Sequence, residues 1–287
     1  MMDPMTHTPD VNWADVVDDM DRGDTVSRPM DEQIVGWLAP PSGARVADLG
    51  SGAGGMTVLL AGAVGAEGSV VAVDGEPALL EATTARSERA GLAERIETLQ
   101  YDLAAGPPPL VDLDLVWAAH VVHHLPDQQS AVTGLARMIA GGGRLALAEG
   151  GLPQRCLPWD VGVGEPGLED RLAAAEADWF AAMRHDQPGA RRAPYGWGSV
   201  LAAAGLTDVM SRSFLLDLPA PLDDDVRSHV TESFTVRVDR VTDRLRSDDL
   251  AAWETLLDAE AGDYLGRRRD VHLLAATTVH VGTRSKK

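Results

Sequence analysis

The stretch Arg45-Val-Ala-Asp-Leu-Gly-Ser-Gly-Ala-Gly-Gly55 decides the fold of this chain. Its first five residues include three compact apolar side chains, as a buried strand requires. Gly50, Ser51 and Gly52 then predict a sharp turn, and residues 56–63 continue as a short apolar helix. Glycines let the backbone approach a ligand where a Cβ would collide, and the helix directs its unpaired N–H groups at the same place. The stretch therefore predicts a strand–loop–helix cradle for a nucleotide-like ligand.

The spacing of the glycines leaves two cofactors open. Gly50, Gly52 and Gly55 match the G-x-G-x-x-G pattern of dinucleotide-binding domains. Asp74 follows at about the distance along the chain where such domains place a ribose-binding acid. Taken alone, the loop fits a nicotinamide cofactor as well as S-adenosylmethionine (SAM).

Composition limits the class of protein. The chain has 287 residues, which suits one large domain or one domain with a sizeable insertion. No apolar run reaches the ~18 residues of a membrane helix, and the start lacks the features of a secretory signal, so we expect no membrane partner and a cytoplasmic location. Cys156 is the single cysteine, which excludes an internal disulfide and a zinc site built from cysteines. We predict no metal site. The net charge of −19 argues against a nucleic-acid substrate.

Outward from the glycine-rich stretch, strand and helix patterns alternate. This alternation predicts an α/β fold with a seven-stranded, mostly parallel, doubly wound sheet. Gly141-Gly-Gly143 is expected to end the helix before it, and residues 150–167 read as a loop. The further strands are predicted at 70–73, 96–100, 113–118, 144–148, 209–216 and 271–283, with helices at 77–91 and 127–139 between them.

The N-terminal 40 residues predict a helical cap that precedes the sheet. Asp10 is expected to cap a first helix, residues 22–29 to form a polar loop, and residues 34–38 to form a second short helix. Residues 41–287 would then form the cofactor-binding domain.

Two segments are expected as insertions in that domain, at 152–195 and 217–268. They leave or join strands at the carboxyl edge of the sheet, where ligands of open α/β folds bind. Their helices could cap the substrate pocket, pair with a second subunit in a homodimer, or both. Their aromatic side chains could stack on an aromatic substrate or pack in the core; these are Trp159, Trp179, Tyr195 and, just beyond, Trp197.

Five segments resemble, in order and spacing, the motifs of class I SAM-dependent methyltransferases, a Rossmann-like family. Asp48, two residues before the first glycine, and the segment Val121-Val-His-His-Leu-Pro-Asp127 look like this family and not like nicotinamide domains. The resemblance covers about residues 45–150 and leaves the insertions outside. The segments are residues 46–55, 70–74, 101–103, 114–127 and 141–147.

The resemblance implies a set of cofactor-binding residues. Asp48 and the glycine turn would hold the methionine part of SAM, and Asp74 would accept hydrogen bonds from both ribose hydroxyls. Asp102 would contact the adenine amine, with Leu103 beside it. The full set is Asp48, Gly50, Ser51, Gly52, Asp74, Gly75, Asp102, Leu103 and Ala119.

Methyl transfer asks mainly for alignment and exclusion of water, because SAM carries its own sulfonium leaving group. A general base is needed only when the nucleophile arrives protonated. We expect His120 or His185 in that role, whereas His123 and His124 are expected to be structural, because paired histidines at this place have no uniform chemical role in the family. Glu149 is a further candidate.

The sequence thus predicts a SAM-dependent methyltransferase acting on a small molecule, with O- or N-methylation favoured over C-methylation. The transfer would be an in-line attack on the sulfonium methyl in a desolvated cleft. Two alternatives stay open: an NAD(P)-dependent oxidoreductase, and a SAM-binding protein without methyl transfer.

Overall fold

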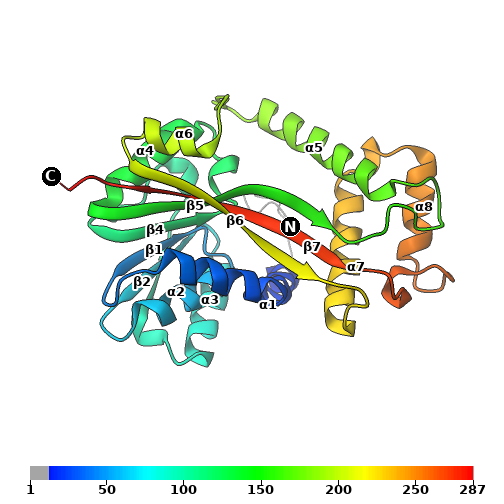
Figure 1. Cartoon of the computed structure of the whole chain (residues 1–287), viewed down its shortest axis with the longest axis horizontal. Coiled ribbons are helices and arrows are strands. Elements are labelled where there is room, and N and C mark those ends of the chain that lie inside the picture. Colours follow the sequence, from blue (N-terminus) through cyan, green and yellow to red (C-terminus); the bar gives the residue numbers. More distant parts are fainter. Residues whose placement is uncertain (1–12, 287) are drawn as a thin grey trace. The chain divides into compact units, whose positions relative to one another are not determined.

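The computed structural model describes residues 13–286, so the predicted helix cap at Asp10 lies outside the described residues. A seven-stranded sheet with strand order β3-β2-β1-β4-β5-β7-β6 forms the centre of the fold (Figure 1). It is mostly parallel with one antiparallel hairpin, which confirms the predicted fold class. The strands are β1 (Arg45–Leu49), β2 (Ser69–Asp74), β3 (Ile96–Gln100), β4 (Leu113–Ala119), β5 (Ile139–Arg155), β6 (Thr207–Leu218) and β7 (Leu273–Thr283).

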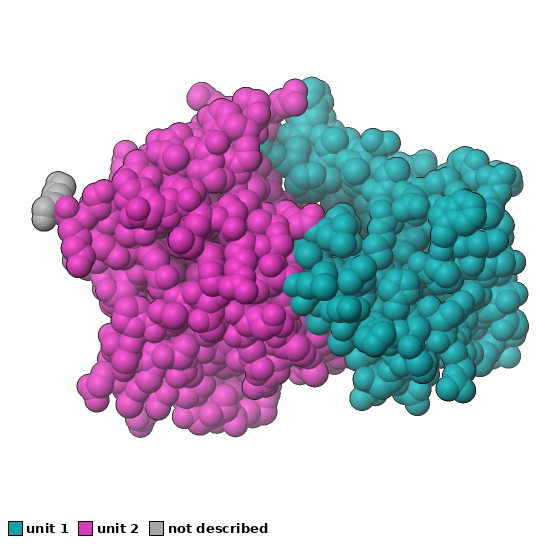
Figure 2. All heavy atoms as spheres, in the orientation of Figure 1, with its two compact units in different colours: residues 1–3, 152–187, 215–276 teal, residues 4–151, 188–214, 277–287 magenta. Residues whose placement is uncertain are grey.

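The chain divides into two compact units, which are coloured separately in Figure 2. Among the described residues, the sheet unit comprises 13–151, 188–214 and 277–286, and the helical unit comprises 152–187 and 215–276. The assignment of residues 1–40 and of the two predicted insertions to substrate capping stays a prediction.

In the sheet unit, helices cover both faces of the sheet. Figure 1 shows α1, α2 and α3 on one side and α4 and α6 on the other. The core between these layers is aliphatic, with Leu49, Leu115 and Leu145 fully buried on adjacent strands. Burial of this kind contributes about 25 cal/mol per Å² of apolar surface. The helices are α1 (Trp13–Leu38), α2 (Gly55–Val64), α3 (Pro77–Arg89), α4 (Gln128–Met138) and α6 (Trp197–Ala203).

The strand register brings the ends of β1, β2, β3 and β4 to one edge. Leu49 at the end of β1 pairs with Val73 of β2 and with Ala118 of β4. Ala119, at the end of β4, pairs with Ala148 of β5. The loops that follow these strands therefore emerge side by side, as expected for the ligand edge of an open parallel sheet.

The first helix is longer than the sequence predicts. Residues 22–29 were expected to form a loop, but α1 runs without interruption from Trp13 to Leu38, with Pro29 inside it. Arg86 of α3 forms ion pairs with Asp21 and Asp24 of α1, and so holds the supposed loop against α3. Tertiary packing thus overrides the local helix-breaking signal of proline.

The fifth strand is also longer than predicted. The three glycines at 141–143 were expected to break a helix, but α4 already ends at Met138 and the glycines lie inside β5. A Cβ on Gly143 would lie 2.6 Å from the carbonyl oxygen of Leu113, so the neighbouring strand requires glycine there. The strand then continues to Arg155, into the region predicted as a loop.

The helical unit has a core of its own. It contains α5 (Leu168–Asp186), α7 (Asp224–Arg240) and α8 (Ser247–Leu257). Phe234 of α7 stacks on Trp253 of α8 with ring centroids 4.9 Å apart, and both side chains are fully buried. Asp223 caps α7 by accepting a hydrogen bond from Val226 N at 2.9 Å. Among the described residues, the helices are all too short or too polar to span a bilayer.

Candidate active site

The glycine-rich turn after β1 is held rigidly against the second strand. Gly50 N and Ser51 N both donate to Val73 O, at 2.7 and 3.1 Å. Thr83 Oγ1 of α3 donates to Gly52 O at 3.0 Å. The turn therefore has a fixed shape before any ligand arrives, and α2 begins directly behind it at Gly55.

Three glycines of the turn have positive φ, for different reasons. At Gly50 (φ +68°) a Cβ would lie 2.3 Å from Val121 Cγ2, and at Gly54 (φ +84°) it would lie 2.9 Å from Thr83 Oγ1. At Gly52 (φ +55°) the nearest atom would be Met20 Sδ, at 3.5 Å. Packing thus requires glycine at 50 and 54, whereas at 52 the backbone conformation is the main constraint.

Asp74 lies at the end of β2, beside the turn, as predicted. Its Oδ2 accepts a hydrogen bond from Gly52 N at 3.0 Å, and its Oδ1 accepts one from Glu76 N at 3.1 Å. Burial raises the pKa of this carboxyl, and the backbone N–H donors oppose that rise. A carboxylate offers about four acceptor positions, so this one can still accept from a ribose hydroxyl.

Asp48 is almost completely buried in β1, only 2% exposed. Thr57 Oγ1 of α2 donates to its Oδ2 at 2.6 Å. Burial raises the pKa of Asp48 to about 7, the Thr57 hydrogen bond opposes the rise, and Asp74 and Asp24 add to it. The carboxyl therefore lies in a negative surrounding that favours binding of a cation nearby.

Two acids of α1 were not selected by the sequence analysis. Asp24 lies so close to Gly55 that a Cβ there would collide with its carboxylate, and burial raises the pKa of Asp24. Asp31 accepts a hydrogen bond from Ser27 Oγ at 2.6 Å, and burial raises its pKa to about 6. The two acids are seven residues apart, which is two turns of a helix, but Asp24 falls in the loop predicted at residues 22–29.

These residues fit SAM when the site is tested against its chemistry. Ser51 Oγ is buried and has no hydrogen-bond partner among residues 13–286, so the turn holds a polar atom that a ligand can satisfy. Asp48 and Asp74 have no arginine or lysine partner within the described chain. SAM is a cation at its sulfonium and its amine, so a negative, glycine-lined cradle suits it.

The remaining predicted cofactor residues lie around the same edge. Asp102 is exposed and its Oδ1 accepts from Ala104 N at 2.8 Å, which caps a short 3-10 turn. Leu103 is buried and lines a small apolar pocket together with Leu49, Ala118 and Val121. Gly75 is exposed and Ala119 is half-buried, each following or ending its strand.

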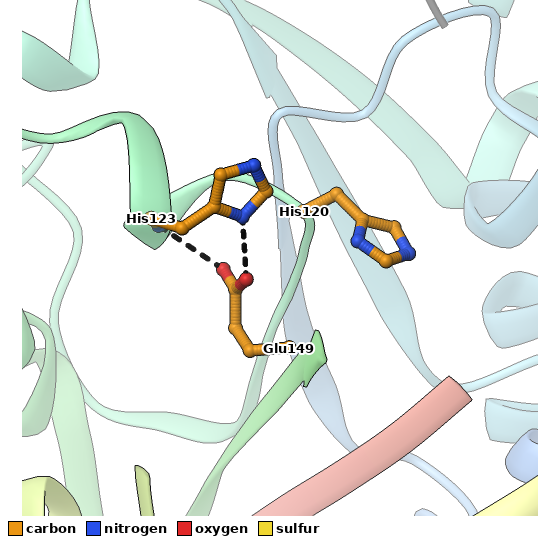
Figure 3. Close-up of side chains that lie close together, drawn as sticks. All are labelled: His120, His123 and Glu149. Carbon is orange, nitrogen blue, oxygen red and sulfur yellow. Dashed lines mark hydrogen bonds and ion pairs between the residues drawn. The ribbon is translucent and has the colours of Figure 1, made fainter. Parts of the chain in front are cut away.

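A cluster of two histidines and a glutamate, His120, His123 and Glu149, lies after the end of β4 and within β5 (Figure 3). Because Ala119 pairs with Ala148, the next residues, His120 and Glu149, are neighbours across the two strands. Glu149 Oε1 accepts from Val122 N at 2.8 Å and from His123 N at 3.3 Å. Its Oε2 is 2.6 Å from His123 Nδ1. The glutamate side chain is 1% exposed.

His120 has a positive φ of +56°, which is uncommon for a residue other than glycine. His120 N donates to Ala148 O at 3.0 Å, which fixes the turn after β4. Burial lowers the pKa of its ring, while Glu149 opposes the change and His123 adds to it. The imidazole is therefore mainly neutral near pH 7 and can accept a proton.

The structure does not bring all the predicted base candidates into one unit. His185 is exposed near the end of α5 in the helical unit, whereas His120 belongs to the sheet unit. The role of His185 stays a prediction. The partnership of Glu149 with His123 was missed, because the register of β4 against β5 is not visible in the sequence.

The fold and the cradle define the class of protein: a Rossmann-like domain of the SAM-binding type. Residues 46–143 match the model of a family described as "Methyltransferase domain". This match confirms the resemblance of that part of the chain to the class I SAM-dependent methyltransferases.

Known relatives agree with this assignment. The chain is 29% identical over 118 residues to 27-O-demethylrifamycin SV methyltransferase from Amycolatopsis mediterranei, covering 41% of this chain and 43% of that enzyme. It is 29% identical over 222 residues to trans-aconitate 2-methyltransferase from Methylobacterium radiotolerans, covering 67% and 76%. Most of the first relatives are matched over about half of their length.

A solved structure supports the fold alone. The YcgJ protein of Bacillus subtilis superimposes with a TM-score of 0.51 at 17% identity, covering 90% of this chain and 99% of that one.

Proposed function

We propose that this protein transfers the methyl group of SAM to a small-molecule acceptor, at oxygen or nitrogen in preference to carbon. The observation that carries the proposal is the glycine turn with its buried, cation-free acids, which matches a positively charged adenosyl ligand. The named relatives are methyltransferases, including enzymes that act on a rifamycin and on trans-aconitate. The nicotinamide alternative keeps only the literal glycine pattern in its favour.

Different residues of the sheet unit would bind different parts of SAM. The backbone of the turn would lie along the methionine part, Ser51 Oγ would hydrogen-bond to it, and Asp48 would orient its amine by charge. Asp74 would accept from the ribose hydroxyls, and Asp102 with Leu103 would face the adenine. Ser51 Oγ has no hydrogen-bond partner among the described residues, and the carboxylates of Asp74 and Asp102 keep lone pairs for a ligand.

The reaction itself needs alignment more than side-chain chemistry. When bound, SAM supplies a methyl group on a sulfonium leaving group. Residues at the ends of β4 and β5 would exclude water and face the acceptor, and Ala119 leaves room there because its side chain is small. His120 would accept the acceptor's proton at a ring nitrogen, consistent with the lowered pKa of its imidazole.

Isothermal titration with SAM, S-adenosylhomocysteine and NADH tests the cofactor part of the proposal. We expect micromolar binding of both adenosyl ligands and no binding of NADH; NADH binding without SAM binding would contradict it. Incubation with methyl-labelled SAM and a panel of phenols, carboxylic acids and amines then tests transfer. If SAM binds but no label moves to any acceptor, a SAM-binding protein without transfer becomes the better assignment.

The proposal extends to the type of acceptor, the oligomeric state and the location. An aromatic acceptor, a homodimer and a cytoplasmic location rest on the sequence predictions. We likewise propose that residues 152–195 and 217–268 cap the substrate pocket.

A further inference from the structure

The cluster of His120, His123 and Glu149 has a feature that methyl transfer does not explain. Its imidazole nitrogens and carboxylate oxygens lie so that one ligand atom from each residue falls within 4.8 Å of the other two. Atoms bound to one ion at about 2.1 Å lie at most about 4.2 Å apart. The three groups thus need only a small closure to share an ion.

The buried carboxylate of Glu149 has no permanent cation beside it. Among the described residues no lysine or arginine pairs with it, and its side-chain partner is the imidazole of His123. A buried carboxylate without a cation is costly, so such groups are commonly paired or coordinate a metal. The backbone N–H groups of Val122 and His123 satisfy Oε1, and Oε2 faces His123 Nδ1.

The backbone also holds His120 in place at a cost. A residue other than glycine at φ +56° lies in a sparsely populated conformation that persists only when the surroundings enforce it. Here the strand ladder enforces it, through the hydrogen bond from His120 N to Ala148 O. The His120 ring makes no hydrogen bond within the described part of the chain, and its centroid lies 6.1 Å from that of His123. Figure 3 shows the three side chains gathered at this place.

We propose that His120, His123 and Glu149 bind one divalent transition-metal ion of the Zn²⁺ type. Two imidazoles and one carboxylate are ligands for Zn²⁺ and for Fe²⁺, and three protein ligands leave coordination positions open. Such an ion would hold a hydroxyl or carboxylate oxygen of a small molecule and lower the pKa of a bound hydroxyl. This last role rests on the proposed methyl transfer and would replace His120 as the group that removes the acceptor's proton, whereas the ion site itself does not rest on that transfer.

Metal binding can be measured without knowing the acceptor. Tag-free, chelator-treated protein is dialysed to equilibrium against buffered ZnCl₂, and the retained zinc is measured by mass spectrometry. We expect about one zinc ion per chain. Glu149→Gln and His120→Asn should each weaken zinc binding at least tenfold. Mutation of a residue that only hydrogen-bonds to a metal ligand already lowers metal affinity tenfold or more. His185→Ala, which changes an exposed histidine of the other unit, serves as the matched control and should retain the ion.

The two variants protect the test against misfolding. Glu149 supports the loop at Val122, so Glu149→Gln can disturb the fold. His120→Asn keeps a side chain that tolerates positive φ, and it removes no hydrogen bond of the ring. Circular dichroism and S-adenosylhomocysteine titration check that each variant is folded.

The outcomes separate the ion site from the proposed function. Zinc binding that is lost in His120→Asn supports the site even if no adenosyl ligand binds. Absence of bound zinc in the wild type, or equal binding in wild type and His120→Asn, would overturn it and leave Glu149 and His123 as a metal-free acid–imidazole pair. Failure of SAM binding with intact zinc binding would reject only the proposed function.

Discussion

Two buried acids, Asp249 of the helical unit and Asp48 of the sheet unit, are balanced in opposite ways. Asp249 in the helical unit is 3% exposed and forms ion pairs with Arg171 at 2.8 Å and with Arg246 at 2.9 Å. These partners lower its pKa to about 2. Asp48 in the sheet unit is equally buried, receives only a hydroxyl, and its pKa is raised to about 7.

The difference distinguishes structural acids from acids that await a ligand. At Asp249 both cations, Arg171 and Arg246, are part of the chain, so the charge pair is complete. In the sheet unit Asp48 and Asp74 have no such cation among the described residues, and both lie at the glycine turn. An unbalanced buried acid at a ligand edge indicates that the missing charge arrives from outside.

The largest effect is expected where the charge pair is complete. Asp249→Ala leaves Arg171 and Arg246 without their carboxylate, and breaking a buried pair in this way costs about 3–5 kcal/mol. Urea unfolding followed by circular dichroism should show this loss. Asp248→Ala, an exposed neighbour on the same helix, is the control and should change stability by less than about 0.5 kcal/mol. Equal effects of the two changes would break the comparison.

Asp48 should behave in the opposite direction. Because its pKa is higher in the folded chain than the ordinary 3.8, folded protein keeps a proton that unfolded protein releases between about pH 4 and pH 7. Wild-type stability should therefore fall as pH rises through this window. Asp48→Asn should remove that fall and be more stable than wild type at pH 8, by on the order of 2–4 kcal/mol.

Urea midpoints at pH 5 and pH 8 measure this effect, with Asp114→Asn as the control for an exposed strand aspartate. The same Asp48→Asn protein should bind SAM more weakly than wild type, because the lost charge faced a cation. A variant that is less stable than wild type at pH 8 would show that Asp48 is balanced like Asp249.

The glycine turn allows a test in which the shape of the site is changed and its charge is kept. Gly52→Val forces a β-branched side chain into φ +55° inside the cradle, and we expect SAM affinity to fall by about 100-fold, or about 2.7 kcal/mol. Gly91→Val is the matched control, since Gly91 has φ +67° and open space around it. If both variants bind SAM like wild type in isothermal titration, the turn is not the cofactor cradle.

The smallest effect concerns the single hydrogen bond to Asp48. Thr57→Val removes the donor at 2.6 Å and should cost about 1–2 kcal/mol of stability above pH 7, where the carboxylate is ionised. Thr84→Val, which loses only a bond to Leu80 O within its own helix, is the comparison. Urea unfolding at pH 5 and pH 8 should show the Thr57 effect shrinking at the lower pH.

Local patterns were enough to predict the elements around the glycine turn. The strand at 45–49, the helix behind it and the cap of α4 by Asp127, which accepts from Ser130 N at 2.9 Å, follow from short-range signals. The course of α1 could not be predicted, because the ion pairs that Arg86 makes with Asp21 and Asp24 come from a helix far along the chain.

The candidate site was predicted in its parts but not in its connections. His120 and Glu149 were both named, yet their proximity depends on the register of Ala119 with Ala148. Strand register is set by packing against both faces of a sheet, which a single sequence does not display. The contact of Glu149 with His123 follows from that register and from the short helical turn at 122–124.

Isothermal titration of SAM into wild type and Asp74→Ala tests the central claim most directly. The account predicts micromolar binding to wild type and at least tenfold weaker binding to Asp74→Ala, since charged hydrogen bonds each contribute about 1.5–3 kcal/mol. Asp114→Ala, which changes an aspartate at the start of β4 that accepts from Arg45 N, should bind SAM like wild type. Unchanged affinity of Asp74→Ala would contradict the claim that the buried acids of the sheet unit hold a cationic cofactor.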